Sequence, residues 1–273
     1  MTPGFLLIDK PPGPTSHDVV SRVRRATGEK RVGHAGTLDP FASGLLLVGV
    51  GREATRELGK FVGLDKWYEA TFLLGVGSDT DDITGTIRPS IPNTRYQIPN
   101  TTQINTAIST LTGPLNQIPP SYAAIKIGGK KMYAAAREGK PLVAPPRPVV
   151  IHSFELVEFH VTDYGAPSSV PPQFQTPVPQ SLIHNTVSIR VRIHCSSGTY
   201  IRSLARDLGQ ALGTKGLVTE LRRTSIGPFS ISESLPLSTL SAPSATPAPT
   251  ALLALLPIES TLSRLPPSAT IHT

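Results

Sequence analysis

Cysteine is nearly absent from this sequence, since Cys195 stands alone among 273 residues. A single thiol can form no internal disulfide and no multi-cysteine zinc site, and it fits a reducing cytoplasm. The seven histidines have no CxxC or HExxH companion, so no metal centre is predicted. Long apolar runs are also missing: Asp9 ends the first one, and the run at 251–256 is far too short to span a bilayer. The sequence therefore predicts neither a signal peptide nor a membrane segment.

Nucleotide-binding signatures are almost as scarce. No GxxxxGKS loop occurs, which argues against nucleotide hydrolysis. One string, GVGREA at 49–54, imitates a dinucleotide fingerprint, because it follows an apolar run, precedes a helix and has Glu69 twenty positions after Gly49. No second βαβ unit follows it. A dinucleotide-dependent oxidoreductase is therefore a remote alternative, and no cofactor is predicted.

Basic residues outnumber acidic ones. The 26 Lys and Arg against 19 Asp and Glu give a net charge of +7 and a pI near 9.7. Such a balance favours a polyanionic partner, of which nucleic acid is the leading candidate, although a solvated basic surface without a partner would have the same composition. Arg22, Arg24 and Arg25 predict a basic face on one helix, and Arg190 and Arg192 predict another on a strand.

The order of the expected elements sets the fold class. Ser16 is expected to cap a helix that Gly28 ends, and apolar residues alternate with polar and basic ones over 187–194, as in a half-buried strand. Other strands are expected at 5–8, 67–74 and 121–127, and other helices at 52–61, 104–111, 133–138 and 204–212. Because this order has no regular βαβ rhythm, we expect an α+β fold with a mixed, largely antiparallel sheet flanked by helices.

Composition also suggests how the chain is organised. Residues 166–180 are rich in Pro, Ser and Thr and are expected to form an inserted surface loop. A similar stretch at 241–250 looks like a linker. The expected division is one large domain at 1–235, followed by a linker and a short C-terminal region at 236–273.

Three residues carry the candidate chemistry. Asp39 lies in the glycine-rich loop GHAGTLDP, where the glycines allow close approach of a ligand, although Asp before Pro is also ordinary turn chemistry. Arg202 begins a helix and could hold a carboxylate through two hydrogen bonds, or could be a solvated helix arginine. Tyr68 could stack on a base, or could simply pack in the sheet.

Taken together, the motifs resemble those of the TruB-type bacterial tRNA pseudouridine synthases. The resemblance covers residue 4 to about residue 232 and rests on five strings in family order: LLIDKPPGPTS, RVGHAGTLDPFASGLLLVGVG, KWYEATFLLGVGSDTDDITG, IPPSYAAIKIGGKKMYAAAREG and HCSSGTYIRSLARDLG. It implies the pseudouridine synthase fold and isomerisation of the T-loop uridine of tRNA. The stretch after residue 250 looks like only the start of the family's C-terminal RNA-binding domain.

The resemblance also assigns roles to residues of this chain. It implies that Asp39 is the nucleophile, that Arg202 is its ion-pair partner and that Tyr68 stacks on the flipped uracil. The remaining positions that match substrate-binding residues are His34, which would enter the RNA loop, Lys10, which would support the catalytic loop, and Tyr200 and Leu221, which would line the uracil pocket.

The implied partner is the T-arm stem-loop of tRNA. Basic side chains would hold its phosphates, and loop shape would supply specificity. We expect a cytoplasmic protein that uses no cofactor and no metal. The expected state is a monomer, and no protein partner is implied. A non-catalytic tRNA-binding or RNA-folding protein with the same fold is the main alternative.

Overall fold

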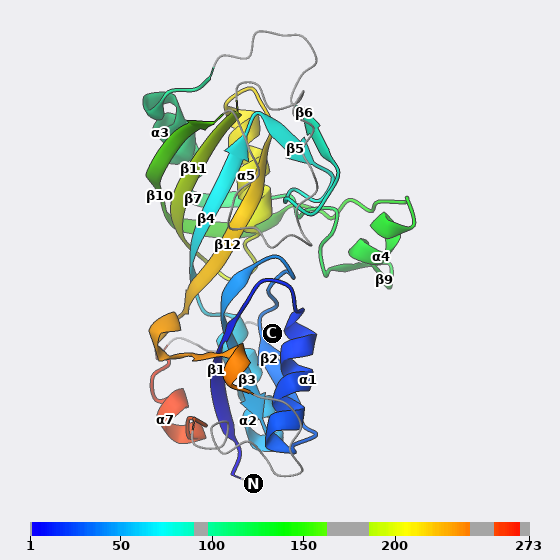
Figure 1. Cartoon of the computed structure of the whole chain (residues 1–273), viewed down its shortest axis with the longest axis vertical. Helices are drawn as coiled ribbons and strands as arrows, with labels where there is room; N and C mark the ends of the chain where they lie inside the picture. The colour runs from blue at the N-terminus through cyan, green and yellow to red at the C-terminus, as the bar shows by residue number, and fades with distance from the viewer. Residues whose placement is uncertain (1, 90–97, 163–185, 241–253, 268–273) are drawn as a thin grey trace. The chain divides into compact units, whose positions relative to one another are not determined.

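A computed structural model describes residues 2–89, 98–162, 186–240 and 254–267. The expected insertion at 166–180 and the expected linker at 241–250 lie outside these ranges. The chain divides into two compact units: unit 1 contains residues 1–68 and 222–273, and unit 2 contains residues 69–221. Two strands, β4 (Lys66–Leu74) and β12 (Gly216–Ile226), contribute residues to both units (Figure 1). Among the described residues, no helix combines the length and apolar character needed to cross a membrane.

Unit 1 is a small mixed sheet with a helix on each face. Strand β3 pairs antiparallel with β1 and β2, and parallel with Arg222 and Arg223 of β12. β1 also pairs parallel with β14, and β13 pairs with β12. The elements are β1 (Gly4–Lys10), α1 (Ser16–Thr27), β2 (Val32–Ala35), β3 (Ser43–Val50), α2 (Arg52–Val62), β13 (Phe229–Ser230), η3 (Ile231–Glu233), β14 (Leu235–Pro236), η4 (Leu237–Thr239) and α7 (Ile258–Leu262).

The alternation of side chains along β1 and β3 explains why both faces of this sheet are covered. Leu6 and Ile8 pack in one cluster with the valines of α1, whereas Phe5 and Leu7 pack in another with Ala54 and Phe61 of α2. Successive strand residues point to opposite faces, so a strand that is apolar throughout needs a helix on each side.

The start of α1 differs from the expectation. Thr15, not Ser16, is the N-cap, and it forms a capping box with Asp18. Ser16 is buried instead, and its hydroxyl donates to the carbonyl of Leu38 (3.2 Å) and accepts from the Leu38 amide (2.9 Å). The expected cap is wrong by one residue because Ser16 binds the loop at 36–42 rather than its own helix.

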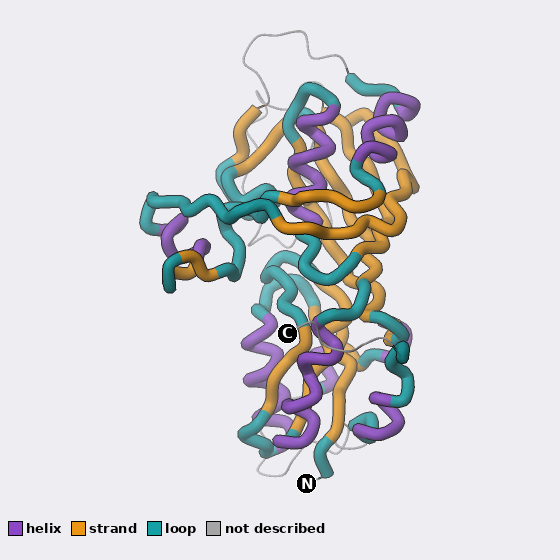
Figure 2. The backbone as a smooth tube through the Cα atoms, turned by 180° about the vertical axis from the view of Figure 1, so that it is seen from behind, coloured by secondary structure: helices purple, strands orange, loops and turns teal. Residues whose placement is uncertain are grey.

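Unit 2 is built on a sheet with the strand order β12-β4-β11-β10-β7, and β11 and β7 both pair antiparallel with β10. A small segment carrying β8, β9 and α4 projects from it (Figures 1 and 2). The further elements are β5 (Val76–Ser78), β6 (Ile87–Pro89), α3 (Thr101–Thr110), β7 (Gly113–Gln117), β8 (Lys126–Ile127), β9 (Lys130–Lys131), α4 (Met132–Arg137), β10 (Arg147–Thr162), β11 (Thr186–Cys195) and α5 (Ile201–Ala211).

Helix α5 lies tightly against the start of β12. A Cβ atom added at Gly216 would lie 2.2 Å from the carbonyl oxygen of Ala205, and one added at Gly209 would lie 2.3 Å from the Gly216 nitrogen. Two glycines therefore allow backbone to pack directly on backbone, which fixes the position of the α5 side chains over the sheet.

Two outcomes concern the expected strands of unit 2. The strand expected at 187–194 is confirmed as β11, and its four apolar residues are fully buried. The strand expected at 121–127 is wrong, since only Lys126 and Ile127 pair. The carbonyls of Ala123 and Ile125 accept instead from the start of α4, so they are not available to a strand ladder.

Glycine 44 provides a test of the packing in unit 1. It has φ +108°, and an added Cβ would lie 2.3 Å from the carbonyl oxygen of Arg223. We expect Gly44→Ala to lower the free energy of unfolding by about 2 kcal/mol or more, from backbone strain and the clash together. The matched control is Gly59→Ala in α2, where nothing lies within 4 Å and alanine should stabilise by about 0.5–1 kcal/mol. Urea denaturation of both variants checks the opposite signs.

Candidate active site

The loop that carries Asp39 is held by a buried lysine. Lys10 is fully buried, and its ammonium donates to the carbonyls of Pro11 (3.0 Å), Pro14 (2.9 Å) and Pro40 (3.2 Å). The amide of Gly13 also donates to Pro40 (2.8 Å). An ammonium has three protons and no acceptor, so Lys10 satisfies three carbonyls at once. It thereby joins the turn after β1 to the residue that follows Asp39.

A second buried cation lies behind the same loop. Arg223 on β12 is 1% exposed, and it donates to the carbonyls of Leu45 (2.8 Å) and Gly36 (3.1 Å). Gly36, in the left-handed region with φ +84°, begins the loop at 36–42. Together with the Ser16–Leu38 pair, these contacts fix the loop at its start, before Asp39 and after it. Arg223 and Ser16 were not identified from the sequence as supports for this loop.

These neighbours perturb two titratable groups. Burial lowers the pKa of Lys10 to about 8; the charge of Asp39 opposes this shift and that of Arg223 adds to it. The pKa of His34, on β2, is lowered chiefly by burial and further by Arg223 and His17. The lowered pKa favours the neutral form of the His34 imidazole.

Arg202 occupies the first turn of α5 and is 4% exposed. Its guanidinium donates to the carbonyls of Thr80 (2.9 Å) and Tyr122 (3.1 Å) and lies 3.6 Å from Oδ2 of Asp82. Burial raises the pKa of Asp82, while Arg202 and hydrogen bonds from Thr84 and Thr80 oppose the rise. The reading of Arg202 as a solvated helix residue is wrong, because the side chain is enclosed and hydrogen-bonded.

Asp82 was missed by the sequence reasoning, although it lies within the string GSDTDDITG. Its Oδ1 accepts from the Thr80 hydroxyl (2.8 Å) and from the backbone amide (2.9 Å) of Thr84. A run of polar residues gives no periodic signal, so the sequence could not show which aspartate is buried. The position of Asp82 beside Arg202 makes it a positioning residue for that guanidinium.

Tyr200 and Leu221 also have defined surroundings in unit 2. The buried side-chain amide of Gln117 accepts from the Tyr200 nitrogen (2.8 Å) and donates to its carbonyl (3.1 Å). This pair of bonds fixes the residue before Arg202. Leu221 on β12 is 8% exposed.

The predicted site residues fall into two groups. Lys10, His34, Asp39 and Tyr68 belong to unit 1, whereas Arg202, Tyr200 and Leu221 belong to unit 2. Within unit 1 the structure brings Lys10 to the Asp39 loop, and within unit 2 Tyr200 directly precedes Arg202. Tyr68 is 8% exposed and lies on β4, so much of its ring is buried. The ion pair between Arg202 and Asp39 stays a prediction.

The face of β11 that carries Arg190 and Arg192 is less basic than the sequence suggests. On β11, Arg190 forms a close ion pair with Glu158 of β10, and Arg192 lies 3.9 Å from Glu155. Cross-strand carboxylates therefore neutralise much of the charge that the sequence suggested for phosphate binding. Mixed-sign pairs of this kind are ordinary stabilisers of a sheet surface.

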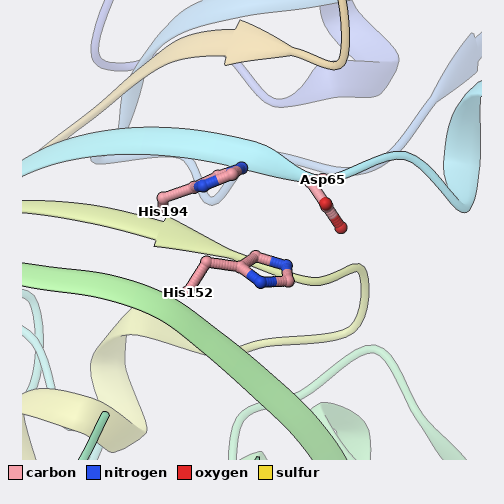
Figure 3. Close-up of side chains that lie close together, drawn as sticks. All are labelled: Asp65, His152 and His194. Atoms are coloured by element: carbon pink, nitrogen blue, oxygen red, sulfur yellow. The ribbon is translucent and has the colours of Figure 1, made fainter. Parts of the chain in front are cut away.

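Two histidines lie together at the other end of these strands. The register of β10 and β11 shifts between Ile151 and Ser153, and this bulge turns His152 toward His194, with ring centroids 4.6 Å apart (Figure 3). Both histidines belong to unit 2.

The family comparisons agree with this arrangement of motifs. A family model described as "TruB family pseudouridylate synthase (N terminal domain)" matches residues 24–201, and one described as "tRNA pseudouridylate synthase B C-terminal domain" matches residues 202–263. The chain belongs to the TruB family of pseudouridylate synthases. Membership overturns the oxidoreductase alternative: GVGREA is the turn from β3 to α2, and β3 is antiparallel to both β1 and β2.

Curated relatives carry a consistent name. A protein of Corynebacterium jeikeium named tRNA pseudouridine synthase B is 44% identical over 237 residues, which are 87% of this chain and 70% of the relative. One of Thermobifida fusca with the same name is 42% identical over 242 residues, 89% of this chain and 75% of the relative.

Solved structures confirm the fold class. A chain of a Cbf5-Nop10-Gar1 complex matches 86% of this chain at 26% identity with a TM-score of 0.57. A chain of an H/ACA RNP bound to a substrate RNA containing 2′-deoxyuridine matches 86% at 25% identity with a TM-score of 0.55. This chain spans about half the length of each of them. The α+β pseudouridine synthase fold expected from the sequence is therefore confirmed.

The lowered pKa of Lys10 predicts a specific pH dependence of stability. Its pKa is about 8 in the fold and 10.5 for an ordinary lysine, so between these values the unfolded chain binds more protons and stability must rise with pH. We expect the unfolding free energy of the wild type, relative to Lys10→Met, to increase by about 3 kcal/mol from below pH 8 to above pH 10.5.

Urea denaturation of both proteins across this pH range measures the effect, and the common titrations of other groups cancel in the difference. At pH 7 the variant should already be less stable, because the Pro11 and Pro14 carbonyls lose their donor. Parallel pH curves would show that Lys10 titrates as an exposed lysine.

Proposed function

We propose that this chain is a tRNA pseudouridine synthase that isomerises a uridine of the T-arm stem-loop, with Asp39 as the catalytic nucleophile. The observation that carries the proposal is the loop of Asp39, held at both ends by Lys10, Ser16 and Arg223. A carboxylate fixed in this way can act at a defined point, whereas one on a loose turn would have to be ordered for each turnover.

The isomerisation of uridine to pseudouridine requires a catalytic carboxylate but no redox reagent and no second substrate. The N1–C1′ glycosidic bond breaks, the uracil turns, and a C5–C1′ bond forms; the proton lost from C5 is balanced by one gained at N1. Nothing is oxidised, reduced or transferred to a second molecule. A carboxylate that captures or stabilises the reacting fragment is sufficient as the covalent or electrostatic catalyst.

Other residues prepare the substrate. A base inside an RNA loop must leave its stack to reach a pocket, which costs a few kcal/mol. We propose that the neutral ring of His34 fills the gap, that Tyr68 stacks on the flipped uracil, and that Tyr200 and Leu221 line its pocket. Arg202 is the proposed ion-pair partner of Asp39. We further propose that the enzyme is a cytoplasmic monomer.

Asp39→Asn tests the nucleophile. The amide is nearly isosteric but is a far weaker nucleophile, so pseudouridine formation should fall by at least about three orders of magnitude, while tRNA binding stays within about twofold of wild type. Base-selective mapping of pseudouridine in unmodified tRNA measures turnover, and filter retention measures binding. The control is Asp18→Asn, which weakens the cap of α1 by about 1 kcal/mol and should leave kcat unchanged.

The same experiment separates this proposal from the alternative of a non-catalytic RNA-binding protein. If wild-type protein binds tRNA but forms no pseudouridine, the non-catalytic alternative is correct. Residual activity of Asp39→Asn within tenfold of wild type would remove Asp39 from the nucleophile's role.

Arg202→Lys tests the second half of the site. A lysine presents a point charge and cannot donate in a fixed fork to Thr80, Tyr122 and a carboxylate together, so single-turnover rates should fall by on the order of a hundredfold. The matched control is Arg206→Lys, one turn later in α5, whose guanidinium contacts Asp81 and Asp207. Equal losses in both variants would indicate damage to α5 rather than to the chemistry.

A further inference from the structure

Five basic side chains gather at the end of the β2–β3 hairpin that lies away from Asp39. Arg25 is in the last turn of α1, Lys30 and Arg31 precede β2, and Arg52 and Arg56 are in the first turns of α2. We call this set the basic end. All five side chains are exposed, and all belong to unit 1.

Hydrogen bonds to backbone carbonyls hold the basic end together. The amide of Gly51 donates to the carbonyl of Arg31 (2.8 Å), which places Arg31 beside the start of α2. The guanidinium of Arg24 donates to the carbonyl of Val32 (3.0 Å), which joins the end of α1 to β2. The charges are therefore presented by a fixed frame rather than by a loose tail.

The basic end differs from Arg222 and Arg264 of unit 1 in having no carboxylate partners among the described residues. Arg222 forms a two-bond pair with Asp9, and Arg264 forms one with Glu233. Among the described residues, by contrast, no carboxylate forms an ion pair with any member of the basic end. Residues 24–31 and 52–56 hold six basic and two acidic side chains, and Glu29 already accepts from the backbone amide of Arg31.

Distance separates the basic end from the nucleophile. Asp39 lies before the first residue of β3, and the basic end lies beyond its last. Because a strand rises about 3.4 Å per residue, the eight residues of β3 put roughly 25 Å between them. One nucleotide cannot touch both, so a polyanion that engages both must extend well beyond the flipped base.

We propose that the basic end is a docking surface for the phosphate backbone of a tRNA segment outside the loop that carries the target uridine. This inference rests on the proposed function, since it assumes that the loop is presented to Asp39. Exposed guanidiniums without carboxylate partners bind phosphate in a sequence-independent way and set position rather than specificity. Binding so far from the reacting bond stabilises ground state and transition state equally, so it acts on KM and not on kcat.

The test is a variant with Arg25, Arg31, Arg52 and Arg56 all changed to glutamine. These residues are exposed and belong to no part of the proposed catalytic machinery, and a thermal melt verifies the fold. With full-length unmodified tRNA we expect KM to rise on the order of tenfold with kcat unchanged. The plot of log affinity against log salt should flatten by roughly 0.7 to 0.9 for each phosphate that the variant no longer binds, or about 3 for all four arginines.

Two controls sharpen the result. An isolated T-arm hairpin, which carries the target loop but lacks the rest of the tRNA, should show nearly the same KM for the variant and the wild type. Glu53→Gln removes a carboxylate from the first turn of α2 and should shift affinity for full-length tRNA the opposite way, toward tighter binding.

Three results would overturn the proposal: an unchanged salt slope with full-length tRNA, an equal rise in KM with the hairpin, or a fall in kcat with KM constant. Filter retention measures tRNA binding independently of pseudouridine formation. A wild-type protein that bound tRNA with the expected salt slope but made no pseudouridine would contradict the proposed function and still support the docking surface. If the wild type makes pseudouridine normally but the glutamine variant keeps the wild-type salt slope, the proposed function stands and the docking surface is wrong.

Discussion

The contact between Lys10 and three proline carbonyls is the constraint on which the candidate nucleophile depends. Proline carbonyls belong to residues that have no amide proton, so segments such as KPPGPTS contain few donors of their own. One buried ammonium satisfies Pro11, Pro14 and Pro40 together and joins two loops that lie about thirty residues apart in the chain. Burial destabilises the charged form of Lys10, and the pKa of its ammonium is therefore lowered.

Much of the fold could be predicted from sequence because the apolar periodicities are strong. The four buried residues of β11, the valines of α1 and the leucines of α5 each mark a face, and the structure has a strand or helix at each place. Strands β10 and β12 were missed for physical reasons. The bulge at His152 interrupts the alternation of β10, and Arg223 looks like a surface residue in β12 although it is 1% exposed.

Motif resemblance pointed to the candidate catalytic residues and to Lys10, but not to the other residues that hold the Asp39 loop and Arg202. Ser16 looked like a helix cap and instead binds Leu38, and Asp82 was one aspartate in a polar run. Local preferences predict that Ser and Asp favour caps and turns, and tertiary contacts decide which of them are buried. Ser16, Arg223 and Asp82 could not be predicted as positioning residues, because the partners of each lie far away in the sequence.

The distribution of paired and unpaired arginines separates two uses of positive charge in this chain. Arg202 and Arg223 are buried, and each donates to backbone carbonyls, so their geometry is fixed before any RNA arrives. Arg190 and Arg192 are exposed but neutralised by glutamates, so they add little net attraction for phosphate. Only exposed cations without a carboxylate partner remain available to a polyanion at no cost in broken ion pairs. Net charge alone therefore could not locate an RNA-binding surface. The hydrogen-bond and ion-pair partners of each arginine show whether its charge is used within the fold or is available to a polyanion.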